Sequence, residues 1–442
     1  MSEPAELRPQ PRVLTRAEHS LSRAFVSPNA LKVLYRLHRA GFVAYLVGGA
    51  VRDLLLGRTP KDFDIGTNAR PQQVRQLFRN ARVIGRRFRL VMVRFTGEIV
   101  EVATFRRSPE PPEIENGETV DVLAPTPEAD EFGTPEEDAW RRDFTVNGLF
   151  YNIADFSVID HVGGLEDLQA GVIRTIGEPG TRFAEDPVRM MRAVEYGARL
   201  GFRLDSRLAD AIGAMHAEIR RAAPARIAYE LVESLKGGHS QAIVRGLDES
   251  GLLQHTVPEA HEAAESSPRP LLWRLLARAD ELVLGGQRLS EETLLALLLL
   301  PSVVEALPGE GGKGRPPGEV ERSVRECLDG VALRLTFSHY RSHLLRSGFL
   351  MLSRLMAQPR SAKAVLRTVK HEAFPVAWDL AHLMGAADDR FRSMLAPWEQ
   401  TVARVKAGLT PEVAERSSEK ATRGKRRRRG SRRRAAAQRS GG

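Results

Sequence analysis

One segment restricts the fold of this chain more than any other, because a strand, two glycines and a short helix follow one another directly. Phe42–Val47 is apolar and rich in β-formers, and it leads into Gly48 and Gly49. Ala50–Leu56 then has a helical pattern, with Arg52 one turn into it. Glycines let a ligand approach the backbone closely, and amide groups at a helix start favour phosphate. The spacing matches neither the dinucleotide-binding nor the P-loop fingerprint, which leaves another kind of phosphate turn or an ordinary junction.

Two carboxylates follow this helix at a spacing of two. Asp62 and Asp64 flank Phe63, and on a strand residues i and i+2 point to the same side. Such a pair can hold two Mg²⁺ ions about 4 Å apart, as in-line phosphoryl transfer requires. One ion would activate an RNA 3′-hydroxyl and the other would steady the leaving pyrophosphate. An exposed turn is the alternative for an isolated Asp-x-Asp.

A third acid is expected from a neighbouring strand. The stretch Glu98–Phe105 alternates, so Glu101, Ala103 and Phe105 share one face. An acid beside apolar side chains is costly to leave unpaired. We therefore predict that Glu101 is a metal ligand, and the alternative is a salt bridge to an arginine.

A basic and acidic segment further along offers nucleotide contacts. Asp143 and Asn147 are four apart, which predicts one helix face with Arg142 beside them. That face could read the ribose hydroxyls and the triphosphate. A solvated helix start is the alternative.

Selection of the base is predicted at Asp186 and Arg189. Asp186 precedes Pro187, as a helix N-cap does, and Arg189 stands three residues on. An acceptor beside a donor matches the Watson–Crick edges of adenine and cytosine and rejects guanine and uracil by about 1–3 kcal/mol each. The pair cannot separate ATP from CTP, and a helix cap without base contacts is the alternative.

Five motifs in order resemble the bacterial poly(A) polymerase and CCA-adding enzyme family of polymerase-β-like nucleotidyltransferases. They are Leu46–Gly57 with Asp62 and Asp64, Arg141–Asn147, Asp160–Gly164, Glu185–Arg192 and, more weakly, Pro224–Leu231. The likeness covers about residues 13 to 260.

The resemblance implies roles for individual residues. It makes Asp62, Asp64 and Glu101 the ligands of two Mg²⁺ ions and adds Asp143 to the active site. It implies that Asp186 and Arg189 read the incoming base. The nucleotide-binding set that it implies is Gly48, Gly49, Arg52, Arg142, Asn147, Asp186, Arg189 and Arg192.

A basic stretch favours the poly(A) branch of the family over the CCA-adding branch. Val83–Leu90 resembles the signature of bacterial poly(A) polymerases, and its Arg86, Arg87 and Arg89 are predicted to bind RNA phosphate. The signature usually has His where this chain has Met92. We therefore expect AMP transfer from ATP to RNA 3′ ends, which promotes RNA turnover. A CCA-adding tRNA nucleotidyltransferase is the alternative, and a non-catalytic RNA-binding protein is a second one that would not need clustered carboxylates.

Periodicity predicts an α/β head with a small mixed sheet, followed by an all-α neck and body. Pro109–Glu136 reads as a flexible loop because it is acidic, rich in proline and glycine, and without periodicity. The predicted division is a flexible leader at 1–27, a catalytic head at 28–157, a neck for base recognition and RNA binding at 158–237, an RNA-binding body at 238–410, and a disordered tail at 411–442.

The charge of the chain is concentrated at its end. The net charge is +10 over 442 residues, and residues 416–442 alone carry +11, so the rest sums to −1. Like charges with little apolar surface predict a disordered arm that binds RNA, and a solubilising terminus is the alternative. Its predicted RNA contacts are Arg426, Arg427, Arg428, Arg429, Arg432, Arg433 and Arg434.

The remaining composition excludes other classes. Cys327 is the single cysteine, so no intrachain disulfide can form, which fits a reducing cytoplasm. No run of 18 apolar residues and no signal-peptide pattern occur. We expect a cytoplasmic protein whose partners are RNA and ATP.

Overall fold

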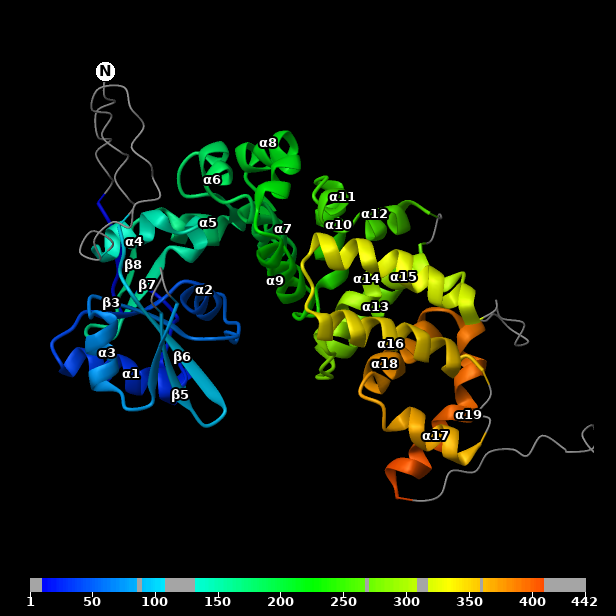
Figure 1. Cartoon of the computed structure of the whole chain (residues 1–442). Helices are drawn as coiled ribbons and strands as arrows, with labels where there is room; N and C mark the ends of the chain where they lie inside the picture. Colours follow the sequence, from blue (N-terminus) through cyan, green and yellow to red (C-terminus); the bar gives the residue numbers. More distant parts are fainter. Residues whose placement is uncertain are drawn as a thin grey trace, which may run out of the picture. The chain divides into compact units, whose positions relative to one another are not determined.

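The computed structural model describes residues 10–85, 90–107, 132–266, 270–307, 317–357 and 361–408. The chain divides into two units. The first comprises Met1–Ser234 with Ala242–Thr256, and the second comprises Leu235–Gln241 with Val257–Gly442. Figure 1 shows the first unit as a sheet with flanking helices and the second as helices alone. The fold class predicted from the sequence is thereby confirmed.

The head is built on an eight-stranded mixed sheet. Its strand order is β1-β8-β7-β2-β3-β6-β5-β4, and a separate pair joins β9 and β10. The β3–β6 pair is parallel, and the other pairs of the large sheet are antiparallel. The bounds are β1 Arg12–Leu14, β2 Ala44–Val47, β3 Asp64–Thr67, β4 Ala81–Ile84, β5 Leu90–Phe95, β6 Glu98–Thr104, β7 Leu149–Asn152, β8 Val158–Asp160, β9 Val172–Ile173 and β10 Arg203–Leu204.

Helices follow the strands through the first unit and continue beyond it. Up to residue 256 they are η1 Arg23–Phe25, α1 Pro28–Arg39, α2 Gly49–Leu55, α3 Pro71–Leu77, α4 Pro135–Arg141, η3 Thr145–Asn147, α5 Gly164–Ala170, α6 Pro179–Glu185, α7 Val188–Leu200, α8 Ser206–Met215, η4 His216–Arg221, α9 Pro224–Leu235, α10 Ser240–Glu249 and α11 Leu253–Thr256. Beyond it they are α12 Pro258–Glu265, α13 Leu271–Leu284, α14 Glu291–Val304, α15 Pro317–Arg334, α16 His339–Leu355, α17 Ala362–Val369, α18 Phe374–Ala387 and α19 Asp389–Lys406.

Helix α1 covers one face of the sheet, as its sequence pattern requires. Ser27 caps it, with its hydroxyl oxygen accepting from Ala30 N at 3.0 Å. Val33, Leu34 and Leu37 have the spacing of a helical stripe, and all three are fully buried. Burial of each such side chain contributes about 1.5–3 kcal/mol. Together with α3, this helix leaves the other face of the sheet for the site (Figure 1).

The second unit has an entirely helical core. Helix α14 is its most buried element, since every side chain from Leu294 to Leu300 is buried. A helix that is apolar on all sides must be surrounded, and α12, α13, α15, α16 and α18 contact it. Trp398 lies in the same unit and donates from Nε1 to Ala357 O at 2.7 Å, so it is a core residue.

The predicted flexible leader is wrong for residues 10–27, which are the part of it that the structure describes. Residues Arg12–Leu14 form β1 and pair with β8 at the edge of the sheet. Leu21 and Val26 are buried, and His19 Nε2 lies 2.8 Å from Phe156 O. Polar composition suggested a mobile segment, but an open sheet edge and a few apolar side chains are enough to order it.

The predicted flexible loop also needs correction at its end. Helix α4 begins at Pro135, inside the stretch that we assigned to the loop, and Thr134 caps it by accepting from Glu137 N at 3.2 Å. Residues 108–131 of that loop lie outside the described residues. The tail arginines 426–434 and the basic residues Arg86, Arg87 and Arg89 lie outside them as well.

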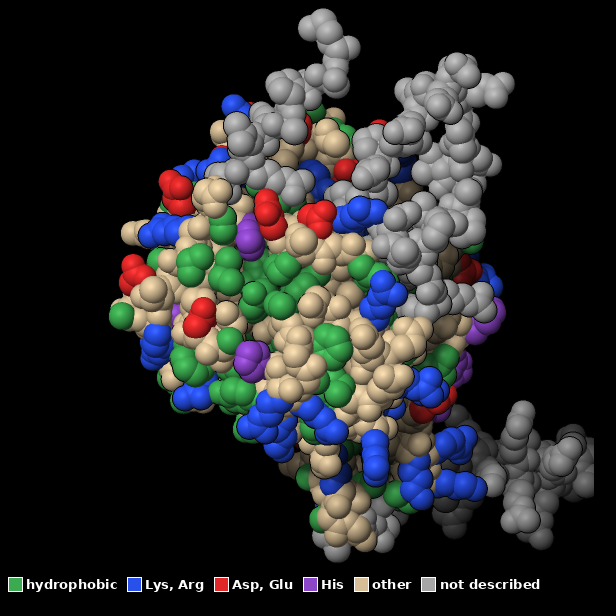
Figure 2. Space-filling model, turned by 90° about the vertical axis from the view of Figure 1, so that its left-hand side faces the viewer, with side chains coloured by type: hydrophobic (Ala, Val, Ile, Leu, Met, Phe, Trp, Pro, Cys, Tyr) green, Lys and Arg blue, Asp and Glu red, His purple; other side chains and the backbone are tan. Residues whose placement is uncertain are grey.

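The surface of the head mixes residue types. Figure 2 shows Lys and Arg side chains over the whole visible face, gathered toward its lower part and interspersed with acidic and hydrophobic ones. Among the described helices, none is both long enough and apolar enough to cross a membrane.

Candidate active site

Gly48 makes the turn between β2 and α2, and its conformation requires glycine. Its φ is +69°, in the region that L side chains rarely adopt. A Cβ at this position would also lie 2.8 Å from Nη1 of Arg142. The turn therefore brings bare backbone and a guanidinium together. Exposed backbone beside a guanidinium can accommodate a phosphate group, and the phosphate-binding role of the two glycines stays a prediction.

Strand pairing places two of the predicted acids side by side. Asp64 opens β3 and is the register partner of Glu101 on β6, so both carboxylates leave the same face of the sheet. On this row of the sheet, Val47 pairs with Asp64 on one side and Met92 pairs with Glu101 on the other. The residue that departs from the expected His therefore lies directly beside a predicted metal ligand.

Asp62 reaches the site in a different way from the one predicted. It precedes β3 and is exposed, so the strand alternation that we assumed for it does not apply. Strand β2 ends at Val47, the partner of Asp64, because Gly48 turns the chain away. Asp62 is nevertheless close, since its charge raises the pKa of both Asp64 and Glu101.

The three acids form a strongly negative cluster. Burial raises the pKa of Asp64 to about 7, and the charges of Asp62 and Glu101 add to the effect while Arg142 opposes it. Burial, followed by the charge of Asp62, also raises the pKa of Glu101. Carboxylates that destabilise each other in this way fit a site for a divalent cation. Among the described residues, no three His, Cys, Asp or Glu side chains form a ready metal-binding cluster.

Asp143 forms an ion pair with Arg192 and is not part of the acidic cluster. Nε and Nη2 of Arg192 donate to its Oδ2 at 2.9 and 2.7 Å, and Asn147 Nδ2 donates to its Oδ1 at 3.0 Å. Burial by itself would raise the pKa of Asp143, but the Arg192 charge and these hydrogen bonds lower it. Asp143 is thus an ionised, fully satisfied carboxylate.

The prediction that Asp143 and Asn147 share the face of one α-helix is wrong, because no α-helix runs through both residues. Helix α4 ends at Arg141, and Phe144 is extended, fully buried and bridged to Thr175. A single 3₁₀ turn, η3, then brings Asn147 back to Asp143. The two residues meet as expected because a buried aromatic pins the bend between them.

Arg52 lies beneath the glycine turn. Its side chain is 2% exposed and donates to Oδ1 of Asp53 at 2.8 Å and to Oδ1 of Asn147. Its guanidinium also stacks over the ring of Tyr196, 5.2 Å from the centroid. A Cβ on Gly49 would lie 3.4 Å from it. The guanidinium of Arg52 therefore lies against Gly49 and at the same time donates a hydrogen bond to Asn147.

Arg142 occupies the open side of the same turn. It donates to Asp138 Oδ2 at 3.0 Å and from Nη1 to Asn147 O at 3.3 Å. Its charge acts on Asp64, so it lies between the glycine turn and the acidic cluster. This is a suitable place for a group that binds a triphosphate.

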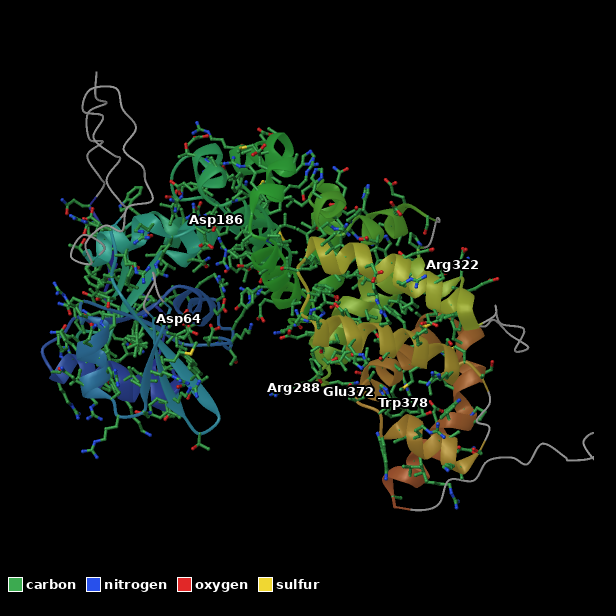
Figure 3. All side chains as sticks on the ribbon, viewed as in Figure 1. Asp64, Asp186, Arg288, Arg322, Glu372 and Trp378 are labelled. Atoms are coloured by element: carbon green, nitrogen blue, oxygen red, sulfur yellow. The ribbon has the colours of Figure 1, made fainter. Side chains whose placement is uncertain are left out.

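The predicted contact between Asp186 and Arg189 is wrong. Arg189 instead donates to Glu185 Oε2 at 2.9 Å and to Arg182 O at 3.1 Å. Asp186 is paired through both carboxylate oxygens with Arg226 of α9, at 2.9 and 3.0 Å. The local N-cap spacing predicted the wrong partner because a distant helix supplies a better one, a bidentate guanidinium. Figure 3 labels Asp186 ahead of α7 and Asp64 on the sheet of the same unit.

Helix α9 supplies further residues that the sequence analysis did not single out. Glu230 lies 3.5 Å from Nη1 of Arg192, and Glu233 lies 2.5 Å from Nζ of Lys61. Lys61 directly precedes Asp62. The helical pattern of this stretch was visible in the sequence, but nothing local indicated which of its acids and arginines would face the site.

Two family models match parts of the chain. One, described as the poly A polymerase head domain, covers residues 44–174. The other, described as the probable RNA and SrmB-binding site of polymerase A, covers residues 201–264. All the predicted nucleotide contacts before residue 175 lie inside the first match.

Relatives align with most of the chain. The poly(A) polymerase I of Salmonella typhi is 38% identical over 424 residues, which are 93% of this chain and 89% of that protein. The CCA-adding enzyme of Bacillus pumilus is 36% identical over 219 residues, 50% of this chain and 52% of that enzyme. A CCA-adding enzyme solved with ATP has a TM-score of 0.55 at 20% identity, covering 88% of this chain and 85% of its own, and so shares the fold.

Proposed function

The chain belongs to the bacterial poly(A) polymerase I family, and from this membership and its site we propose that it adds AMP from ATP to RNA 3′ ends without a template. The observation that carries the proposal is the meeting of Asp64, Glu101 and Asp62 beside the Gly48 turn and Arg142. Acids for a cation and a bare turn for phosphate are the two parts that nucleotidyl transfer requires.

The acids would hold Mg²⁺ in this proposal. Asp62, Asp64 and Glu101 are the ligands, and bound Mg²⁺ would lower the pKa of the RNA 3′-hydroxyl and neutralise the leaving pyrophosphate. The protein fixes Asp64 and Glu101 through the β3–β6 pairing, while Asp62 lies on the exposed segment that precedes β3. Asp64 is partly buried, and this burial is the largest cause of its raised pKa, so charge interactions there are stronger than in bulk water.

The nucleotide would lie along the glycine turn. Gly48 and Gly49 leave room for the triphosphate, and Arg142 binds its oxygens. Asp143, Asn147, Arg192 and Arg52 act by positioning, since they form one network under the turn. In this proposal the ion pair between Asp186 and Arg226 opens, and Asp186 then accepts a hydrogen bond from the incoming base. Arg189 lies about one turn further along, in α7.

RNA would be held by the helical parts and the basic segments. The match to an RNA-binding model over residues 201–264 supports the neck as one contact region. Arg86, Arg87, Arg89 and the tail arginines 426–434 are the proposed phosphate contacts from the sequence. A reducing cytoplasm, indicated by the single Cys327, is the proposed place of action.

Primer extension tests the proposal directly. The full-length protein is given Mg²⁺, a short RNA and each nucleoside triphosphate separately. A long ladder with ATP alone is expected. Asp64→Asn should abolish incorporation and leave RNA binding nearly unchanged, because it removes a ligand without altering the shape of the site. Asp210→Asn, on the exposed side of α8, is the matched control and should extend normally.

Two outcomes would contradict parts of the proposal. Extension of tRNA by CCA followed by arrest would establish the CCA-adding alternative, which the shorter match to CCA-adding enzymes disfavours. Undiminished extension by Asp64→Asn would remove the acidic cluster from the mechanism.

A further inference from the structure

One face of helix α9 touches the site at three successive turns. Arg226 holds Asp186, Glu230 contacts Arg192, and Glu233 holds Lys61. Positions 226, 230 and 233 share a helical stripe because they are spaced by four and three. The stripe therefore runs from the predicted base reader to the residue that precedes Asp62.

Tyr229 stands on the same stripe, three residues after Arg226 and four before Glu233. Its neighbours on the stripe are engaged with Asp186 at one end and Lys61 at the other. Tyr229 itself is 62% exposed. An aromatic side chain is thus presented to solvent in the middle of a face whose flanking residues all contact the site.

The electrostatic surroundings of Tyr229 place its ring near the acids. Burial and then the charge of Glu233 raise the pKa of its hydroxyl, Lys61 lowers it, and the carboxylates of Glu230 and Glu101 raise it further. The Glu233–Lys61 ion pair on the same stripe places this side of α9 beside Asp62, which directly follows Lys61, and the charge of Glu101 on β6 also acts on Tyr229. An exposed ring beside carboxylates and a lysine gains little from apolar packing, and its face remains available for stacking.

We propose that Tyr229 is a positioning residue that stacks on the 3′-terminal base of the RNA primer and so holds the terminal 3′-hydroxyl toward Asp62 and Glu101. The inference rests on the proposed function, because it assigns a place to the second substrate of that reaction. A stacking contact suits repeated addition, since every base offers a ring face and each newly added adenine becomes the next terminal base.

The position of Tyr229 on the stripe favours the primer base over the incoming base. Asp186, the predicted reader of the incoming base, is contacted by Arg226 at the start of α9. Tyr229 lies one turn further on, toward Glu233 and Lys61, and Glu101 is the predicted metal ligand that acts on it. The attacking hydroxyl has to lie next to the metal ligands, so the base that carries it lies on this side.

The contact between Tyr229 and the primer base is tested by combining each of several protein variants with each of two primers. The proteins are the wild type, Tyr229→Ala, Tyr229→Phe and, as a control with equal exposure, Tyr340→Ala. The primers end either in adenosine or in an abasic ribose that keeps the 3′-hydroxyl. KM for RNA, KM for ATP and kcat are measured for every combination.

Tyr229→Ala should raise KM for the adenosine-ended primer about tenfold, within the range expected when one base no longer stacks on a ring, and leave KM for ATP within about twofold. Tyr229→Phe should behave as the wild type because it keeps the ring. The abasic end should weaken the wild type about tenfold and Tyr229→Ala hardly at all. Tyr340→Ala should discriminate against the abasic end as the wild type does.

Three results would overturn the inference while the proposed function stands. They are an unchanged KM for RNA in Tyr229→Ala, an equal penalty for the abasic end with and without the ring, and a loss confined to KM for ATP. The last result would make the ring a platform for the incoming base. No extension by the wild type with ATP would instead defeat the proposed function, and this inference with it.

Discussion

At the residue scale, two glycines with the same backbone angle serve different purposes. Gly48 and Gly57 lie at the two ends of the α2 segment, and both have φ of +69°. A Cβ on Gly57 would meet nothing within 4 Å, whereas a Cβ on Gly48 would meet Arg142 at 2.8 Å. The pair therefore separates the cost of backbone strain from the cost of disturbing the site.

Gly48→Ala is expected to lower kcat/KM for ATP about 10- to 100-fold, because it moves the guanidinium that faces the triphosphate. Gly57→Ala should leave kcat/KM nearly unchanged. Gly57→Ala should lose about 1 kcal/mol of stability from its positive φ, and Gly48→Ala should lose more, because a φ of +69° with a ψ of −132° is essentially restricted to glycine. Steady-state kinetics and urea unfolding of the two variants side by side measure both effects. Equal kinetic losses would show that strain alone, and not Arg142, accounts for the need for glycine.

Asp143 and Arg192 make a second residue-scale prediction, about pH. The folded pKa of Asp143 is lowered, so its ion pair stabilises the fold above its unfolded pKa of about 3.9. That contribution is lost as the pH falls through the lower, folded pKa. Asp143→Asn should therefore cost about 2–3 kcal/mol at pH 7, since Arg192 loses its main partner, and progressively less toward pH 3.

Urea unfolding of the first unit at a series of pH values from 7 to 3 measures this dependence. Asp210→Asn, exposed on α8, is the control and should leave the curve unchanged. If the loss of unfolding free energy in Asp143→Asn stayed constant down to pH 3, Asp143 would stabilise the fold through packing and hydrogen bonds and not through its charge.

At the element scale, the start of α5 depends on one buried carboxylate. Asp160 is 3% exposed, and its Oδ1 accepts from the backbone N–H groups of Val162, Gly163 and Gly164, each at 3.0 Å. Its Oδ2 accepts from Leu165 N at 2.8 Å. One side chain thus satisfies four backbone donors at the start of α5, of which that of Gly164 is on a buried residue.

Asp160→Ala is expected to lower the free energy of unfolding by about 2–4 kcal/mol, because the four donors lose their acceptor. Asp160→Asn should lose less, since its remaining oxygen can serve the three donors on Oδ1. Thermal unfolding of the two variants ranks the losses. An alanine variant as stable as the asparagine variant would show that water replaces the carboxylate at this turn.

At the scale of the whole molecule, the charge distribution predicts that the tail contributes to RNA binding and the rest of the chain to catalysis. Residues 1–415 sum to a net charge of only −1, whereas residues 416–442 contribute 12 Lys and Arg residues against one acid. Because arginine contacts to phosphate release counterions, RNA affinity that depends on the tail should fall steeply with salt.

Deletion of residues 416–442 is expected to weaken RNA binding and to flatten its salt dependence by about 0.7 in the log–log slope for each phosphate that the tail no longer neutralises. Basal extension at saturating RNA should persist. A second variant that replaces the 12 basic residues with serine keeps the length and isolates the charge. An unchanged slope in both would show that the tail does not touch RNA.

The sequence predicted best what depends on neighbours along the chain. The strand before Gly48, helix α2 and strand β6 lie where the sequence pattern placed them. It erred where order comes from pairing with a distant edge, as for β1, and where a buried aromatic bends the chain, as at Phe144. Strands β7 and β8 were not predicted, because they are short and mostly buried and therefore show too little alternation to detect.

What the sequence by itself determined is the local chemistry: the bare glycine turn, Asp64 at the start of β3 with Asp62 two residues before it, the apolar stripe of α1 and the basic tail. Only the tertiary structure decided which charged groups meet. Arg192 finds Asp143 at 49 residues, Arg226 takes Asp186 at 40, and Lys61 reaches Glu233 at 172. The physical reason is that an ion pair has no periodicity in sequence. Many acids in the sequence could pair with each of these Arg and Lys side chains, and the packing of α7 and α9 against the head decides which acid does.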